Sequence, residues 1–220
     1  MKHTAIILLM TATALAGCGS TTTVDDYRPT AEPMDIGTGD KVAVLGRRDA
    51  GHYETDRDFI NCLGNQLSKS NFQVMMEESF VDALYPWFEP RTAPKHLHRL
   101  KKIMEIPTVQ EKIRSEKISY LVWLDGEVES HDMSGAMHCG LGPYAIGCFG
   151  YTSWDKVVTF EAIVWNLQDL TEEARIRVDS EGTSYVIGIV APIPLLTRVE
   201  SEACVGLGNQ LLSYFTQEVE

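Results

Sequence analysis

The chain has 220 residues, of which 44% are hydrophobic and 23% charged, and its formal net charge at pH 7 is −12. A chain of this length and composition can bury a sizeable core and fold as a globular protein. The acidic balance excludes a nucleic-acid-binding role, which needs clustered Lys and Arg to displace counterions from phosphate. The basic cluster at residues 99–102 is interpreted as the solvated face of a helix.

The N-terminus has the layout of a secretory signal. Lys2 precedes an apolar run over residues 5–10, which is too short to span a membrane, since a spanning helix needs about 20 such residues. The string Leu15-Ala16-Gly17-Cys18 resembles the lipobox of bacterial lipoproteins. The resemblance implies cleavage before Cys18, acylation of that residue and retention at the outer membrane, because Gly19 rather than Asp follows it. The alternative is a released periplasmic protein.

These signals define three parts of the chain. Residues 1–17 are predicted to be the signal peptide. Residues 18–40 are rich in Ser, Thr, Asp, Gly and Pro and lack an apolar period, which predicts a flexible tether between lipid and domain. Residues 41–220 are predicted to fold as a single mixed α/β domain facing the periplasm of a Gram-negative bacterium.

Strand and helix signals alternate in the first half of this domain. Residues 41–45 predict a buried strand, and Thr55 or Asp56 then caps a helix. Residues 72–76 predict a second strand, parallel to the first, because consecutive strand, helix and strand favour a right-handed crossover. Prolines divide the next region into short helices over 80–84, 94–104 and 107–115.

The second half is predicted to be mainly strands. Residues 118–124 form the next strand, and a long Gly-rich loop follows it. Residues 157–167 and 174–180 predict a hairpin, residues 184–194 continue the sheet, and the Thr197-Arg198-Val199-Glu200 capping box opens the last helix. The predicted fold is α/β, with a three-to-five-stranded mixed sheet, helices packed against it and the order β-α-β-α-α-β-β-β-α.

Several short strings follow the lipobox in a fixed order. They are Val-Ala-Val-Leu in the first strand, Phe-x-Val in the second, Tyr-Leu-Val-Trp in the third and Ala-Cys-x-x-Leu-Gly in the closing helix. This order resembles the periplasmic α/β lipoproteins related to the curli secretion channel, and the lipoprotein activators of penicillin-binding proteins are similar. The resemblance implies architecture and compartment. Residues 85–91 and the Gly/Cys-rich loop depart from it, so partners and pore formation are not carried over.

Four cysteines remain besides Cys18, and an even number in an oxidising compartment predicts disulfides. Cys139 and Cys148 bracket a glycine-rich stretch that lets the chain fold back on itself. Cys62 and Cys204 then pair by elimination, and both lie on the apolar faces of predicted helices. The alternative for Cys62 and Cys204 is a pair of buried free thiols.

One segment has metal-ligating side chains. His131, Met133, Met137, His138 and Cys139 could suit Cu(I), or zinc if Cys148 is added. Their spacing matches no diagnostic ligand pattern, and a disulfide between Cys139 and Cys148 would remove the thiolate. The favoured interpretation is a disulfide-pinned surface loop, and no metal ligand is assigned.

Three aromatic residues stand together between prolines and acids: Tyr85, Trp87 and Phe88. Aromatic residues of this kind are favoured as interface anchors, which predicts a partner-binding segment. The alternative is a lid over one edge of the core.

No catalytic signature is present in the sequence. It lacks Gly-x-Ser-x-Gly, a phosphate loop, His-Glu-x-x-His and Ser-x-x-Lys, and no cofactor is predicted. We therefore predict a non-catalytic envelope lipoprotein, anchored through Cys18, that acts as an interaction or assembly module on an envelope protein partner. The alternatives are a copper- or zinc-binding periplasmic protein that uses the 131–148 loop, and a hydrolase with an unfamiliar site.

Overall fold

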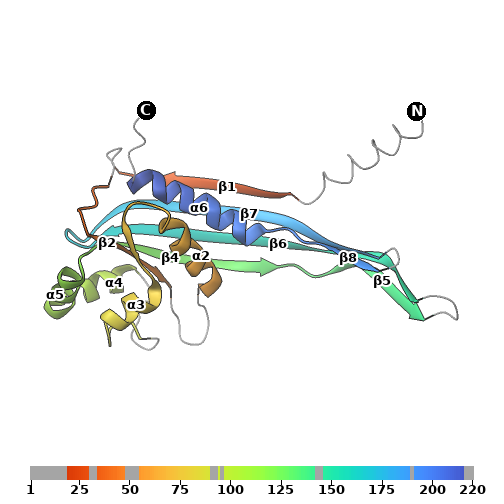
Figure 1. Cartoon of the computed structure of the whole chain (residues 1–220), viewed down its shortest axis with the longest axis horizontal. Helices are drawn as coiled ribbons and strands as arrows, with labels where there is room; N and C mark the ends of the chain where they lie inside the picture. Colours follow the sequence, from red (N-terminus) through yellow and green to blue (C-terminus); the bar gives the residue numbers. More distant parts are fainter. Residues whose placement is uncertain are drawn as a thin grey trace. The chain divides into compact units, whose positions relative to one another are not determined.

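Figure 1 shows the computed structural model, which describes residues 19–29, 34–47, 55–89, 94, 97–141, 146–188 and 191–215. The predicted signal peptide and Cys18 lie outside the described residues. The chain divides into two compact units, which we name the α/β unit (residues 22–128, 158–179 and 200–220) and the hairpin unit (residues up to 21, 129–157 and 180–199). Each unit is described by itself.

The prediction of an α/β fold with a mixed sheet is confirmed. Eight strands pair in the order β1-β7-β6-β4-β2-β3, with β5 beside β6 and β8 beside β7. The strands are β1 Ser20–Tyr27, β2 Lys41–Gly46, β3 Gln73–Met75, β4 Ile118–Ser130, β5 Ser134–Leu141, β6 Ile146–Asn166, β7 Thr171–Gly188 and β8 Pro192–Leu195. The helices are α2 Arg57–Leu67, α3 Glu77–Ala83, α4 Leu97–Met104, α5 Pro107–Glu116 and α6 Val199–Phe215. The sheet thus has eight strands where three to five were expected.

The centre of the α/β unit is the parallel strand β2. It pairs in parallel with β3 on one side, as predicted, and with β4 on the other. Its residues Val42 to Gly46 are all buried, as expected for a parallel strand covered on both faces. Ala43 and Leu45 belong to a core cluster with residues of α3, α4 and α5. Helices α2 and α6 contribute further buried residues to this unit, among them Leu63 and Leu207.

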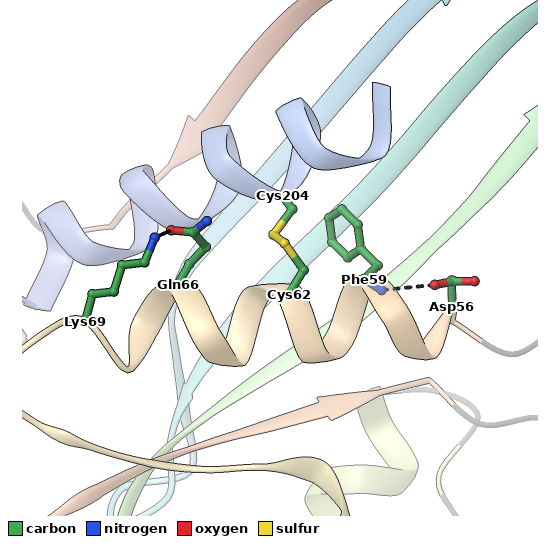
Figure 2. Close-up of a disulfide and its surroundings, with 6 residues drawn as sticks. All are labelled: Asp56, Phe59, Cys62, Gln66, Lys69 and Cys204. Atoms are coloured by element: carbon green, nitrogen blue, oxygen red, sulfur yellow. Dashed lines mark hydrogen bonds between the residues drawn. A yellow bond between two sulfur atoms is a disulfide. The ribbon is translucent and has the colours of Figure 1, made fainter. Parts of the chain in front are cut away.

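A disulfide joins α2 to α6 (Figure 2). The Cα atoms of Cys62 and Cys204 are 6.4 Å apart, within the range a disulfide bridges, so the predicted pairing is confirmed. Asp56 caps α2 by accepting a hydrogen bond from the Phe59 amide at 3.0 Å, also as predicted. At Gly208 in α6, a Cβ atom would lie 2.9 Å from Gln66, so glycine permits the close approach of the two helices.

Part of the segment expected to be a flexible tether is a strand, β1. Its run of Thr residues is β-branched, which favours extended backbone, and β7 provides a neighbouring strand. The Tyr214 hydroxyl of α6 donates a hydrogen bond to Asp26 at 2.6 Å, and Gln210 donates to the same carboxylate at 3.1 Å. The segment therefore has fixed partners in the fold. The single domain over residues 41–220 stays a prediction.

The Gly-rich segment expected to be a loop is largely the β5–β6 hairpin. Few of its residues favour strands, and two of its glycines, Gly135 and Gly150, have φ values of 98° and 128° that other residues rarely adopt. In each case an added Cβ would collide with a backbone oxygen of the paired strand. Strand signals in the sequence are weak here because the pairing requires glycine.

Candidate interaction surface

The hairpin unit consists of two consecutive antiparallel pairs. β5 pairs with β6 from Ser134↔Ser153 to Leu141↔Ile146, and β8 pairs with the end of β7. The predicted Cys139–Cys148 disulfide is present and joins two residues that stand directly opposite each other in the register. The bridge therefore holds β5 against β6 near the Leu141↔Ile146 end of their pairing.

Large apolar side chains are exposed mainly in this unit. Of the residues that the structure describes, only Tyr27 and Tyr85 are exposed large apolar residues outside it. The others are Met133, Leu141, Phe149, Tyr151, Ile187, Ile193, Leu195 and Leu196, with exposed fractions from 36% to 82%. Single exposed apolar residues are ordinary, whereas a concentration of them marks a contact surface.

The hairpin unit also lacks charge over most of its length. None of residues 133–154 or 182–197 is Asp, Glu, Lys or Arg, although 23% of the whole chain is charged. Exclusion of charged residues characterises the buried centre of protein interfaces and surfaces that meet lipid. A surface that faces only water has no physical reason to exclude them.

Charged residues appear where these uncharged stretches end. A hollow of about 590 Å³ is lined there by Gly19, His131, Asp155, Glu181 and other residues of the same unit. Asp155 accepts a hydrogen bond from the Thr183 hydroxyl at 2.6 Å, and its carbonyl accepts one from the His131 amide at 2.9 Å. The hollow therefore combines apolar residues with charged ones of a kind that residues 133–154 and 182–197 lack.

The candidate metal ligands of the 131–148 segment lie in the β5–β6 hairpin or just before it. Cys139 is bridged to Cys148 and so supplies no thiolate, and His138 stands opposite Phe149. Within the described ranges, no three His, Cys, Asp or Glu side chains gather as a group that could hold a metal ion. The bridge agrees with the favoured interpretation of a disulfide-pinned segment, whose described residues form a hairpin rather than a loop.

The predicted aromatic partner-binding segment separates into three environments. Phe88 is fully buried and contacts Phe80 edge to face, with ring centroids 5.1 Å apart. Trp87 is partly buried and packs against the same core cluster, while Tyr85 is 66% exposed. Phe88 is thus a core residue and cannot serve as an interface anchor, because no partner can reach it. The lid alternative fits Phe88 and Trp87.

A second surface feature lies in the α/β unit, where β2 ends beside the middle of β4. A groove of about 390 Å³ is lined by residues that include Arg47, Asp125, Glu161 and Arg177. Arg47 pairs with Asp125 at 3.1 Å, and Arg177 pairs with Asp179 at 2.8 Å. The hydrogen bond from Arg177 lowers the pKa of the Asp179 carboxyl below its ordinary value. Ligands often bind at such a strand end, but here the charges pair with one another.

No protein-family model matches the chain, and no curated protein matches it. Among solved structures, two crystal forms of the PelC dodecamer from Paraburkholderia phytofirmans are similar to it. The matches are 13% and 12% identical, cover 89% of this chain and 98% and 97% of the PelC chains, and both have a TM-score of 0.41. A likeness this loose carries no conclusion about assembly or function.

Sequence reasoning did not identify the hairpin unit as a surface. The available signal was the missing charge over residues 133–154 and 182–197, together with the nearly continuous apolar run over residues 185–196. No helix in the described ranges has the length and apolar character needed to cross a membrane.

Proposed function

We propose that the protein is a non-catalytic lipoprotein of the bacterial envelope, anchored in the outer membrane through Cys18, which acts by contact through its hairpin unit. The observation that carries this proposal is the concentration of exposed apolar side chains in a unit whose residues 133–154 and 182–197 include no charged residue. Phe149, Tyr151 and Met133 in this group are of residue types that are enriched in protein interfaces.

The start of the described chain supports the coupling between anchor and surface. Gly19 lines the hollow of the hairpin unit, and β1 begins at the next residue. A lipid on Cys18 would therefore be attached one residue before Gly19 in the sequence. The lipid would then hold the hairpin unit, with its apolar surface, at the membrane.

The anchor is tested by metabolic labelling with radioactive palmitate in a Gram-negative host. The parent chain is expected to take up label and to sediment with outer membranes, whereas the Cys18→Ser variant is expected to do neither. A matched Cys62→Ser variant controls for loss of a thiol elsewhere and should still be labelled. Equal labelling of the parent and Cys18→Ser would contradict the anchor.

The contact surface is tested by photo-crosslinking in intact cells. Benzoylphenylalanine at Leu141, which is 82% exposed, is expected to form adducts that depend on Cys18. The same crosslinker at Tyr85, which is 66% exposed in the α/β unit, is the matched control and is expected to form few. Adducts from Tyr85 alone would move the contact surface away from the hairpin unit.

A further inference from the structure

One edge of β5 is open. Of the strands in the described part of the chain, only β6 pairs with β5, from Ser134 to Leu141. Every β5 residue except Met137 is exposed. The Cα atoms of Cys139 and Cys148 are 4.0 Å apart, nearer the separation of about 4.5 Å of a non-hydrogen-bonded pair than the about 5.5 Å of a hydrogen-bonded one. The backbone N–H and C=O of Cys139 therefore point away from β6, toward the open edge.

The other edge of the hairpin unit is formed by β8, which differs from β5 because it contains prolines. In the described chain β8 pairs with β7 alone, and it contains Pro192 and Pro194. Proline has no N–H to donate, so prolines on an edge strand prevent the addition of another strand. β5 contains neither proline nor a charged residue, the usual protections of an edge. The unit thus has one edge that can accept a strand and one that cannot.

The distribution of charge favours a second copy of the chain as the occupant. The whole chain carries a formal net charge of −12, so two copies repel each other where their acidic surfaces meet. Residues 133–154, which contain β5 and most of its hairpin partner, carry no charged residue. Two copies can therefore approach along β5 without like charges facing each other.

We propose that β5 pairs antiparallel with β5 of a second copy, so that two hairpin units form one continuous sheet. The inference rests on the proposed function in taking the hairpin unit as the contact surface. The pairing is isologous, since the same strand serves in both copies. Because the hairpin unit of each copy uses its one open edge, pairing through this unit closes at two copies and does not extend into a fibre.

The test uses full-length chains with two different tags, co-expressed in intact cells. Benzoylphenylalanine replaces His138, an exposed residue in the middle of β5. We expect adducts between differently tagged copies, and a dimeric mass for the purified chain in analytical ultracentrifugation. In the Gly140→Lys variant, a charged side chain on the edge strand of each copy should oppose the addition of a second strand and reduce the yield of these adducts by about tenfold or more.

Gly140 suits this test because nothing lies within 4 Å of an added Cβ, so the substitution leaves the folded monomer intact. Gly140→Ala is the matched control and should retain the dimer. A monomeric parent chain without tag-to-tag adducts would overturn the proposal, as would a dimer that persists in Gly140→Lys. Adducts only with lipid or with another envelope protein would overturn self-pairing and leave the proposed function in place. If Cys18 is not acylated, palmitate labelling shows this independently of the dimer test.

Discussion

The two disulfides lie in regions that use apolar residues in opposite ways. Cys62–Cys204 joins two helices of the α/β unit, where Cys204 and its neighbours Ala203 and Leu207 are fully buried. Cys139–Cys148 joins two strands of the hairpin unit, in which nearly all of β5 is exposed. The first bridge adds to a core, and the second holds a surface in shape. Monomer folding explains the apolar residues of the first region and leaves those of the second without a role.

Strand β6 contains one buried and one exposed phenylalanine. Phe160 is fully buried and stacks on Phe59, with ring centroids 3.5 Å apart, whereas Phe149 is 64% exposed. The same residue type on the same strand therefore contributes to the core at one position and to the surface at the other. This contrast separates folding from contact, and the following predictions test it.

The largest difference in the free energy of unfolding is expected between variants that lack one or the other disulfide. They close loops with sequence separations of 142 and 9 residues, and chain entropy gives about 5 and about 3 kcal/mol of stabilisation, respectively. In urea unfolding, the Cys62→Ala/Cys204→Ala double variant should lose the larger amount and Cys139→Ala/Cys148→Ala the smaller. Equal losses would show that the two bridges do not differ in this way.

The two phenylalanines of β6 give the next contrast. Phe160→Ala removes a fully buried ring and should lower the free energy of unfolding by about 3–5 kcal/mol. Phe149→Ala removes an exposed ring and should change it by less than about 0.5 kcal/mol. Chemical denaturation of both purified variants measures the difference. A large loss for Phe149→Ala would mean that this residue supports folding.

A smaller effect is expected where β1 meets α6. Tyr214→Phe removes the hydrogen bond to the Asp26 carboxylate, and loss of a hydrogen bond to a charged group should cost about 1.5 kcal/mol. Tyr85→Phe, at an exposed position, is the control and should leave the unfolding midpoint in place. An unchanged midpoint in Tyr214→Phe would indicate that β1 does not depend on this contact.

The smallest effect is expected in the alkaline titration of Tyr214. Burial, and then the hydrogen bond to Asp26, raises the pKa of Tyr214 from 10.0 to about 12. Because the folded-state pKa lies above the unfolded-state value, this group's stabilisation is fully present below about pH 10 and is lost as the pH rises through about 12. Phenolate absorbance should show a titration step near pH 12, and Tyr214→Phe should remove the contribution of this residue to that step.

The sequence predicted the α/β unit well because its signals are local and strong. Residues 41–45 are a continuous apolar run and Asp56 is a typical helix cap, and the structure shows β2 and a capped α2 at these positions. The pairing of Cys62 with Cys204 was also predictable, because the helical period places both thiols on inward faces.

The hairpin unit was less predictable because long-range pairing determines its structure. Gly135 and Gly150 weaken the strand signal, yet the paired backbones need glycine there. Phe88 was misassigned to a surface because prolines around it suggested irregular packing, whereas Phe80 covers its ring. Exposure of an apolar side chain depends on which elements lie beside it, and sequence pattern alone does not determine that.

The central claim is that the apolar residues of the hairpin unit serve contact and not folding. Phe149→Asp tests it most directly, with thermal unfolding of the purified chain and crosslinking from Leu141 in intact cells measured on the same variant. The account predicts an unchanged melting temperature and loss of the Leu141 adducts. A lowered melting temperature with the adducts retained would contradict it.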